Sequence, residues 1–239
     1  MNTHIHESVK DEKGFTLVEL AIVMVIIGLL IGGILKGQEM IANAQVSATV
    51  AQLKGVDAAT STFRDMYDAL PGDITNPAVR IPGCGVAPCN IAGNGNSSLD
   101  GVGVAGVQAA SEETRFWIHL NAADLLTGVD GSANLVWGQG LPTAKAGGGL
   151  TAGFDADGNI GALGNGRGGH YVAIQGDPAT ATSAALTASE AARMDRKMDD
   201  GSANSGSFLA GGGANCGTAA VYNEAADQVA CWVAVRIQG

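Results

Sequence analysis

An apolar run near the N-terminus constrains the fold of this chain more than any other feature. Across residues 15–35 every side chain is apolar, glycine or threonine, except that of Glu19. A helix rises about 1.5 Å per residue, so a run of this length spans a hydrocarbon core about 30 Å thick. Because an isolated carboxylate in hydrocarbon costs on the order of 3 kcal/mol, Glu19 needs a partner and is a candidate functional residue.

A short polar leader precedes the run and ends in Lys13 and Gly14. A secretory signal would place its small-residue cleavage site after the apolar core, and a simple anchor has no reason to place Glu19 one turn into the membrane. A secretory signal and a simple membrane anchor are therefore the alternative interpretations of this segment. Lys10 and Lys13 favour an N-terminus on the cytoplasmic side, although Lys36 after the span weakens this bias. The rest of the chain would then lie outside the inner membrane.

The GFTLVEL segment at residues 14–20 resembles the processing site of type IV pilins and of the related pseudopilins of type II secretion. The resemblance implies that a prepilin peptidase cuts after Gly14 and methylates the new N-terminal amine of Phe15. It also implies that Glu19 neutralises the amine of a neighbouring subunit during filament assembly. The leader, residues 1–14, would then be absent from the mature protein.

The helix that begins with the apolar run is predicted to continue well beyond it. Apolar residues recur at helical spacing after residue 36, with charged residues between them, and Pro71 with Gly72 marks the end near Leu70. We therefore predict a transmembrane or filament-core part at residues 15–35 and an amphipathic part of the same helix at 36–70. Residues 71–239 are predicted to form a globular head.

The head carries signals for further helices and for strands. Ser111 precedes two glutamates and is predicted to cap a helix that Gly128 ends, while Thr187 and Glu190 predict a capping box. Helices and strands in this order fit an α+β fold, with an antiparallel sheet packed on the long helix. The strands are predicted at residues 135–137, 170–175, 207–210 and 229–237.

Charge and composition limit the kinds of function that the head can have. The net charge is −10 with only 13 lysines and arginines, so a nucleic-acid partner is not expected. His119 and His170 lie in no metal-binding or catalytic motif, and no spacing of serine, histidine and aspartate indicates a triad. We therefore predict that the protein is not an enzyme.

The chain contains four cysteines, and sequence alone allows three ways to pair them. In an oxidising compartment the simplest assignment joins Cys84 to Cys89 and Cys216 to Cys231, because each pair is close in sequence. The second pair resembles the disulfide-bounded C-terminal loop of many type IV pilins. A zinc site at Cys84 and Cys89 is the alternative, although no histidine lies nearby in the sequence.

Calcium is the only ligand that the head sequence suggests, and no other cofactor is expected. Asp155, Asp157 and Asn159 place three oxygen-bearing side chains at alternating positions, as the start of an EF-hand loop does. Ile160 stands where that loop requires glycine, so solvated turn residues are the simpler interpretation. Major pseudopilins bind calcium, so the resemblance leaves such a site open. Asp199 with Asp200, and Asn94 with Asn96 and Asp100, offer the same ligand chemistry.

These observations together predict a structural subunit of a type IV pilus or pilus-like filament. Its partners would be other copies of itself, the prepilin peptidase, and an inner-membrane assembly platform with its ATPase machinery. Before assembly the chain would cross the inner membrane once with a periplasmic head, and afterwards it would lie in an extracellular pilus. The alternatives are a pseudopilin in a periplasmic pseudopilus, or a membrane-anchored ligand-binding or enzymatic domain.

Overall fold

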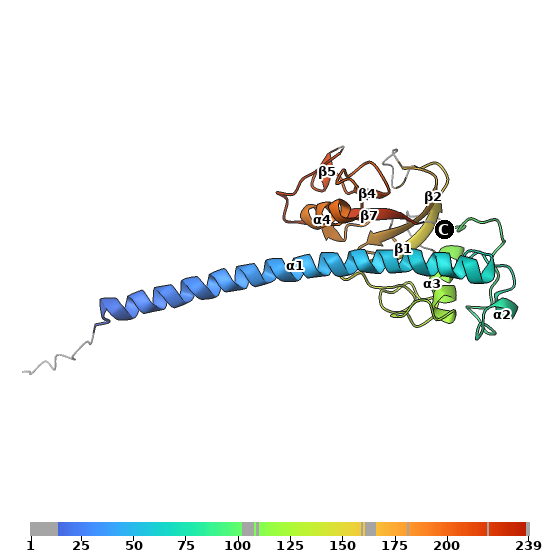
Figure 1. Ribbon diagram of the computed structural model, residues 1–239, viewed down its shortest axis with the longest axis horizontal. Coiled ribbons are helices and arrows are strands. Elements are labelled where there is room, and N and C mark those ends of the chain that lie inside the picture. Colours follow the sequence, from blue (N-terminus) through green and yellow to red (C-terminus); the bar gives the residue numbers. More distant parts are fainter. Residues whose placement is uncertain are drawn as a thin grey trace, which may run out of the picture. The chain divides into compact units, whose positions relative to one another are not determined.

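The computed structural model describes residues 14–101, 108, 110–158, 160, 166–180, 182–218 and 220–237. All of the predicted leader except Gly14 lies outside these residues. The chain divides into two compact units, Met1–Ile41 and Ala42–Gly239. The fold is α+β, as predicted: a long N-terminal helix is followed by a globular head with an antiparallel sheet (Figure 1).

The long helix, α1, comprises 51 residues, Leu17–Tyr67, and runs through the boundary between the units. It ends three residues before the predicted Leu70, where Asp68 takes a positive φ of 44°. Every residue at positions 14–36 is exposed. An 18-residue window of α1 reaches a mean hydropathy of 2.7, so by length and composition this helix can cross a membrane.

The second unit begins with the other part of α1, which is amphipathic. Its buried side chains recur every three or four residues and join the hydrophobic core of the head. The buried hydroxyls of Thr49 and Thr60 donate to the carbonyls four residues earlier, at 2.9 and 2.8 Å, so their burial leaves no donor unpaired. The apolar members of this stripe are Val46, Val50, Leu53, Val56, Ala59 and Phe63.

The main sheet is antiparallel throughout, and its longest strand, β7 (Val229–Ile237), is central. One side of β7 pairs with β2 (Gly169–Gln175), which pairs in turn with β1 (Gly149–Asp155). The other side pairs with β4 (Phe208–Gly211) and with the short β3 (Leu186–Thr187). The predicted strands at 170–175, 207–210 and 229–237 are therefore confirmed. A separate hairpin joins β5 (Gly217–Thr218) to β6 (Val221–Tyr222).

The predicted strand at 135–137 is wrong. Trp137 forms only an isolated bridge with Leu141, and its indole N–H donates to the carbonyl of Gly176 at 3.1 Å. This apolar run is thus a loop that covers β1: a Cβ placed on Gly149 would lie 2.1 Å from the Trp137 ring. Leu135 and Trp137 are partly buried against the core, so packing and not strand pairing accounts for the apolar residues of this loop.

The described residues of the head form three further helices: α2 (Pro77–Arg80), α3 (Glu112–Ala122) and α4 (Ala188–Met198), the last beside β7 in Figure 1. Ser111 caps α3 as predicted, and its hydroxyl accepts from the N–H of Thr114. The predicted end at Gly128 is wrong, because the helix ends at Ala122 and Asp124 adopts a positive φ of 55°. The predicted capping box of Thr187 and Glu190 is present in α4.

A buried histidine joins three segments of the head. The N–H of Gly72, just after α1, donates to His119 Nδ1 at 2.9 Å, and His119 Nε2 lies 3.0 Å from the carbonyl oxygen of Cys89. Because Nδ1 accepts, the proton resides on Nε2 and the ring is neutral. Burial, together with the nearby Arg115, lowers the pKa of His119 to about 4.

Candidate functional site

The start of α1 holds the side chain that the sequence singled out, Glu19. Its Oε2 accepts hydrogen bonds from the main-chain N–H and from the hydroxyl of Thr16, each at 2.8 Å. The N–H of Glu19 donates in return to Thr16 Oγ1 at 3.2 Å. This reciprocal pattern is that of a capping box, which satisfies donors that the first turn of a helix leaves unpaired. Thr16 therefore turns the carboxylate of Glu19 toward the N-terminus.

The surroundings of Glu19 offer it no charged partner within the described part of the chain. Phe15 and Leu17 are 84% and 86% exposed, and the neighbouring residues of the helix are exposed and apolar. None of the ion pairs between described residues includes Glu19. Hydrolysis of the peptide bond after Gly14 would convert the Phe15 amide into a free amine, next to the residue that now holds the carboxylate. Glu19 could accept an ion pair from such an amine, and the described residues of the uncut chain provide no such donor.

Comparison with protein-family models decides what this segment is, because residues 9–35 match one of them. It is a prokaryotic N-terminal methylation motif. The motif includes Gly14, Phe15 and Glu19 together with the apolar beginning of α1. No curated protein and no solved structure matched the chain.

The methylation motif supports a protein of the type IV pilin or pseudopilin class, in line with the predicted resemblance. It implies processing by a prepilin peptidase and assembly into filaments, and it indicates a structural subunit rather than an enzyme. The apolar start of α1 fits a chain that is anchored in the membrane by a single span.

Two disulfides lie in the head. Cys84 is bonded to Cys89, and Cys216 to Cys231, which are the pairs closest in sequence. His119 approaches the first pair, so that its ring nitrogen and both sulfurs lie within 4.8 Å of one another. Since both sulfurs are in a disulfide, this trio has no thiolate to offer zinc. Sequence reasoning missed the approach because His119 lies 30 residues beyond Cys89.

The predicted calcium ligands lie at the end of β1. Asp155 Oδ1 accepts from the N–H of Gly158 at 2.6 Å, which is a turn-forming bond, and Asp157 is exposed. Asn159 lies outside the described residues. Calcium binding here stays a prediction.

A second acidic group, around the end of α4, is engaged in holding loops. Asp195 is fully buried, accepts from the hydroxyl of Tyr222 at 2.7 Å and from the N–H of Gly201 at 3.0 Å, and burial raises its pKa. Asp200 accepts from the N–H of Ser202 at 2.8 Å. These carboxylates thus have structural partners of their own. The other predicted alternative is similar, since Asp100 accepts from the side-chain amide of Asn94 at 2.5 Å and from that of Asn96 at 3.1 Å.

Proposed function

We propose that the mature chain is a structural subunit of a type IV pilus or pilus-like filament. One observation supports this proposal above the others. The methylation motif at residues 9–35 contains the start of α1, and every described residue there is exposed as far as residue 36. Apolar surface of this extent needs lipid or other subunits around it. Before assembly the membrane surrounds this surface with lipid, and after assembly the filament surrounds it with other subunits.

Glu19 has two roles in the proposed assembly. Cleavage after Gly14 and methylation leave a cationic amine on Phe15, and Glu19 of a neighbouring subunit pairs with it inside the filament core. Leaving one member of a buried ion pair alone costs about 3–5 kcal/mol. Subunits stacked in the wrong axial register would incur that cost at every interface. The pair therefore neutralises the amine and also sets the register.

Mass spectrometry of the mature N-terminus tests the first step. We expect a chain that begins at Phe15 and carries a methyl group on its amine. An intact Met1 would indicate a simple anchor, and cleavage after Leu35 would indicate a secretory signal. Either result contradicts the proposal.

The choice of a pilus over a secretion pseudopilus rests on the size of the head, Ala42–Gly239, which offers a large surface for a fibre outside the cell. The two disulfides fit either location, because the periplasm is oxidising as well as the cell exterior. Shearing intact cells and probing the released fibres tests this choice. Recovery in the sheared fraction supports a pilus subunit, and retention in the periplasm favours a pseudopilin.

A further inference from the structure

A cleft in the head gathers positive charge in an otherwise acidic protein. It lies between the residue that leads into β2, the loop before β4 and the end of β7, and its volume is about 570 Å³. This volume falls within the range of small-molecule sites, which is about 300–1,000 Å³. Arg167 and Arg236 both line it, together with Asn204, Ser205, Ser207 and Asp199. In a chain of net charge −10, two guanidinium groups on one cleft stand out.

Arg167 has a fixed main chain and an uncommitted side chain. Its N–H donates to the Tyr171 hydroxyl at 3.2 Å, and its carbonyl accepts from the same hydroxyl at 2.5 Å. Its guanidinium is exposed and makes no hydrogen bond or ion pair with any residue that the structure describes. The base of the side chain is therefore held while five N–H donors remain available.

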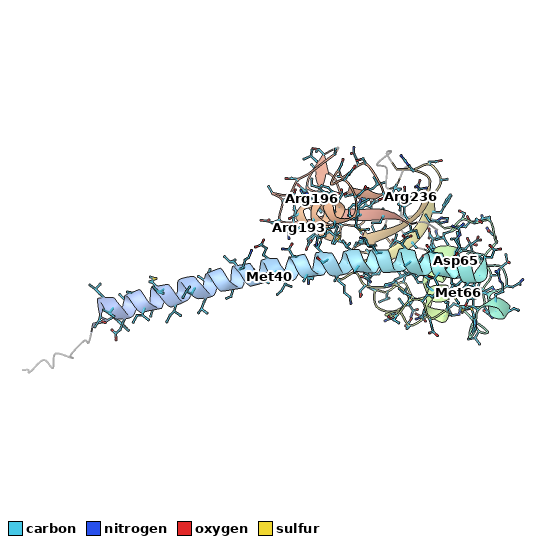
Figure 2. The ribbon with its side chains drawn as sticks, in the orientation of Figure 1. Met40, Asp65, Met66, Arg193, Arg196 and Arg236 are labelled. Atoms are coloured by element: carbon cyan, nitrogen blue, oxygen red, sulfur yellow. A yellow bond between two sulfur atoms is a disulfide. The ribbon has the colours of Figure 1, made fainter. Side chains whose placement is uncertain are left out.

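Arg236 also lines the cleft, and its side chain is held in place. It is exposed between the buried Val235 and Ile237 of β7, and its Nη2 donates to the carbonyl of Gly168 at 3.3 Å. A Cβ on Gly169 would lie 2.8 Å from its Nε, so glycine at that position makes room for the guanidinium. Figure 2 shows Arg236 well apart from Arg193 and Arg196 of α4. Those two arginines have partners, Asn43 and Glu224 respectively.

The acceptors that line the cleft are already engaged. Asp199 Oδ2 accepts from the main-chain N–H of Ser207 and from that of Phe208, the latter at 3.0 Å. Ser205 donates its hydroxyl to Asp200 at 2.7 Å, and Asn204 Oδ1 lies 3.4 Å from the hydroxyl of Ser202. Among the described residues that line the cleft, the free donors belong to the two guanidinium groups and to the side-chain amide of Asn204. Two arginines and the one carboxylate of Asp199 leave this lining with a net charge of +1.

We propose that this cleft binds a divalent oxyanion, such as a phosphate or a dicarboxylate. The planar fork of arginine matches the paired oxygens of these groups, and a phosphate or a dicarboxylate has enough oxygens to engage both forks at once, whereas acetate can fill only one. Arg167 contributes an unpaired guanidinium and Arg236 one that is held by the carbonyl of Gly168, while Asn204 donates from the loop. The site is separate from the N-terminal motif, and its function does not depend on filament assembly.

Titration of the full chain in detergent with inorganic phosphate, followed by isothermal calorimetry, tests the proposal. Sodium chloride holds the ionic strength constant, because exposed charges are screened by salt. We expect saturable binding of phosphate, which is largely dianionic above neutral pH, and much weaker binding of acetate. A parallel titration with succinate tests the binding of a dicarboxylate. Binding of acetate as tight as that of phosphate, or no saturation with either dianion, overturns the proposal.

Arg167→Gln is the main variant, since its guanidinium makes no contact whose loss would unfold the head. We expect it to weaken phosphate binding about tenfold or more, as the loss of a charge-assisted hydrogen bond does. Arg236→Gln should have a similar effect. The matched control is Arg80→Gln on α2, an exposed arginine outside the cleft, which should leave the affinity unchanged. Equal losses in the Arg80 and Arg167 variants would indicate non-specific attraction and refute the site.

Discussion

The two parts of α1 have the same backbone and opposite surroundings. Every residue at positions 14–36 is exposed, whereas Val46 and Phe63 in the later part have no exposed surface. The early part is apolar on all sides, and the later part has an apolar stripe between polar residues. The comparison teaches that local sequence determines the helix, while the distribution of apolar side chains around it determines what must cover it. Among the residues that the structure describes, the later part is covered by the head, and the early part is exposed.

The largest expected effect concerns the charge in the uncovered part. Glu19→Ala should reduce sheared filaments to a trace, because the amine of Phe15 would be buried without a counter-charge. Immunoblots of the sheared fraction measure this, with membrane insertion as a control that should not change. The variant also removes the capping box with Thr16, so the loss of charge and the loss of the cap must be separated.

Glu19→Gln separates them, because glutamine can replace glutamate in a capping box but carries no charge. It should lose filaments as Glu19→Ala does. Thr16→Ala retains the charge and removes the capping hydroxyl, at about 1 kcal/mol in helix stability, and should retain filaments. Normal filament yield from Glu19→Gln would contradict the pairing role.

A smaller effect should distinguish the buried part of the helix from the exposed part. Phe63→Ala should lower the free energy of unfolding of the head by about 3–5 kcal/mol, because it opens a cavity in the core. The matched change Ile27→Ala, at a residue 45% exposed, should leave that free energy unchanged. Urea unfolding of the full chain in detergent, followed by tryptophan fluorescence, measures both. Equal effects would mean that the two parts are covered alike.

The smallest predicted effect is a dependence of head stability on pH. His119 has a folded pKa of about 4, below the unfolded value of about 6.5, so the unfolded chain binds the proton more readily. Stability is therefore complete above pH 6.5 and is lost as the pH falls toward 4, by about 2 kcal/mol at pH 5. The lowered pKa of His170, also a result of burial, acts in the same direction.

Thermal unfolding at a series of pH values checks this effect. His119→Gln should flatten the part of the profile below pH 6.5, although it also lowers stability at neutral pH. The exposed part of α1 contains no histidine, so membrane insertion should not follow the same profile. A head whose stability is the same at pH 5 and pH 7 would contradict the neutral, buried state of His119.

The parts of the fold that sequence predicted are those with a strong local pattern. The long helix, the capping box at Thr187 and the strand at 229–237 each follow from periodicity or from a capping residue. Strand β1 was missed because its sequence, GLTAGFD, contains two glycines and few β-branched residues. Its pairing with β2 is a tertiary property that no local pattern specifies.

The candidate sites show the same contrast between local patterns and contacts that depend on the fold. The motif around Gly14 and Glu19 is contiguous, so sequence was enough to locate it. The contact of His119 with Cys89, and the approach of Arg167 to Arg236 across one cleft, join residues far apart in the chain. Such pairs are brought together by strand register and helix packing, which no local pattern specifies.

The glycines of α1 differ from a glycine of the head in the space that each leaves for a side chain. In the head, a methyl group at Gly72 would lie 2.3 Å from the carbonyl oxygen of Glu112, so the chain itself requires glycine there. At Gly28, Gly32, Gly33 and Gly37 a methyl group would meet no atom within 4 Å. We therefore expect alanine at these four positions to be harmless to the isolated subunit and to act as a spacer in the proposed fibre. Replacing them one at a time would report how closely neighbouring helices approach, position by position.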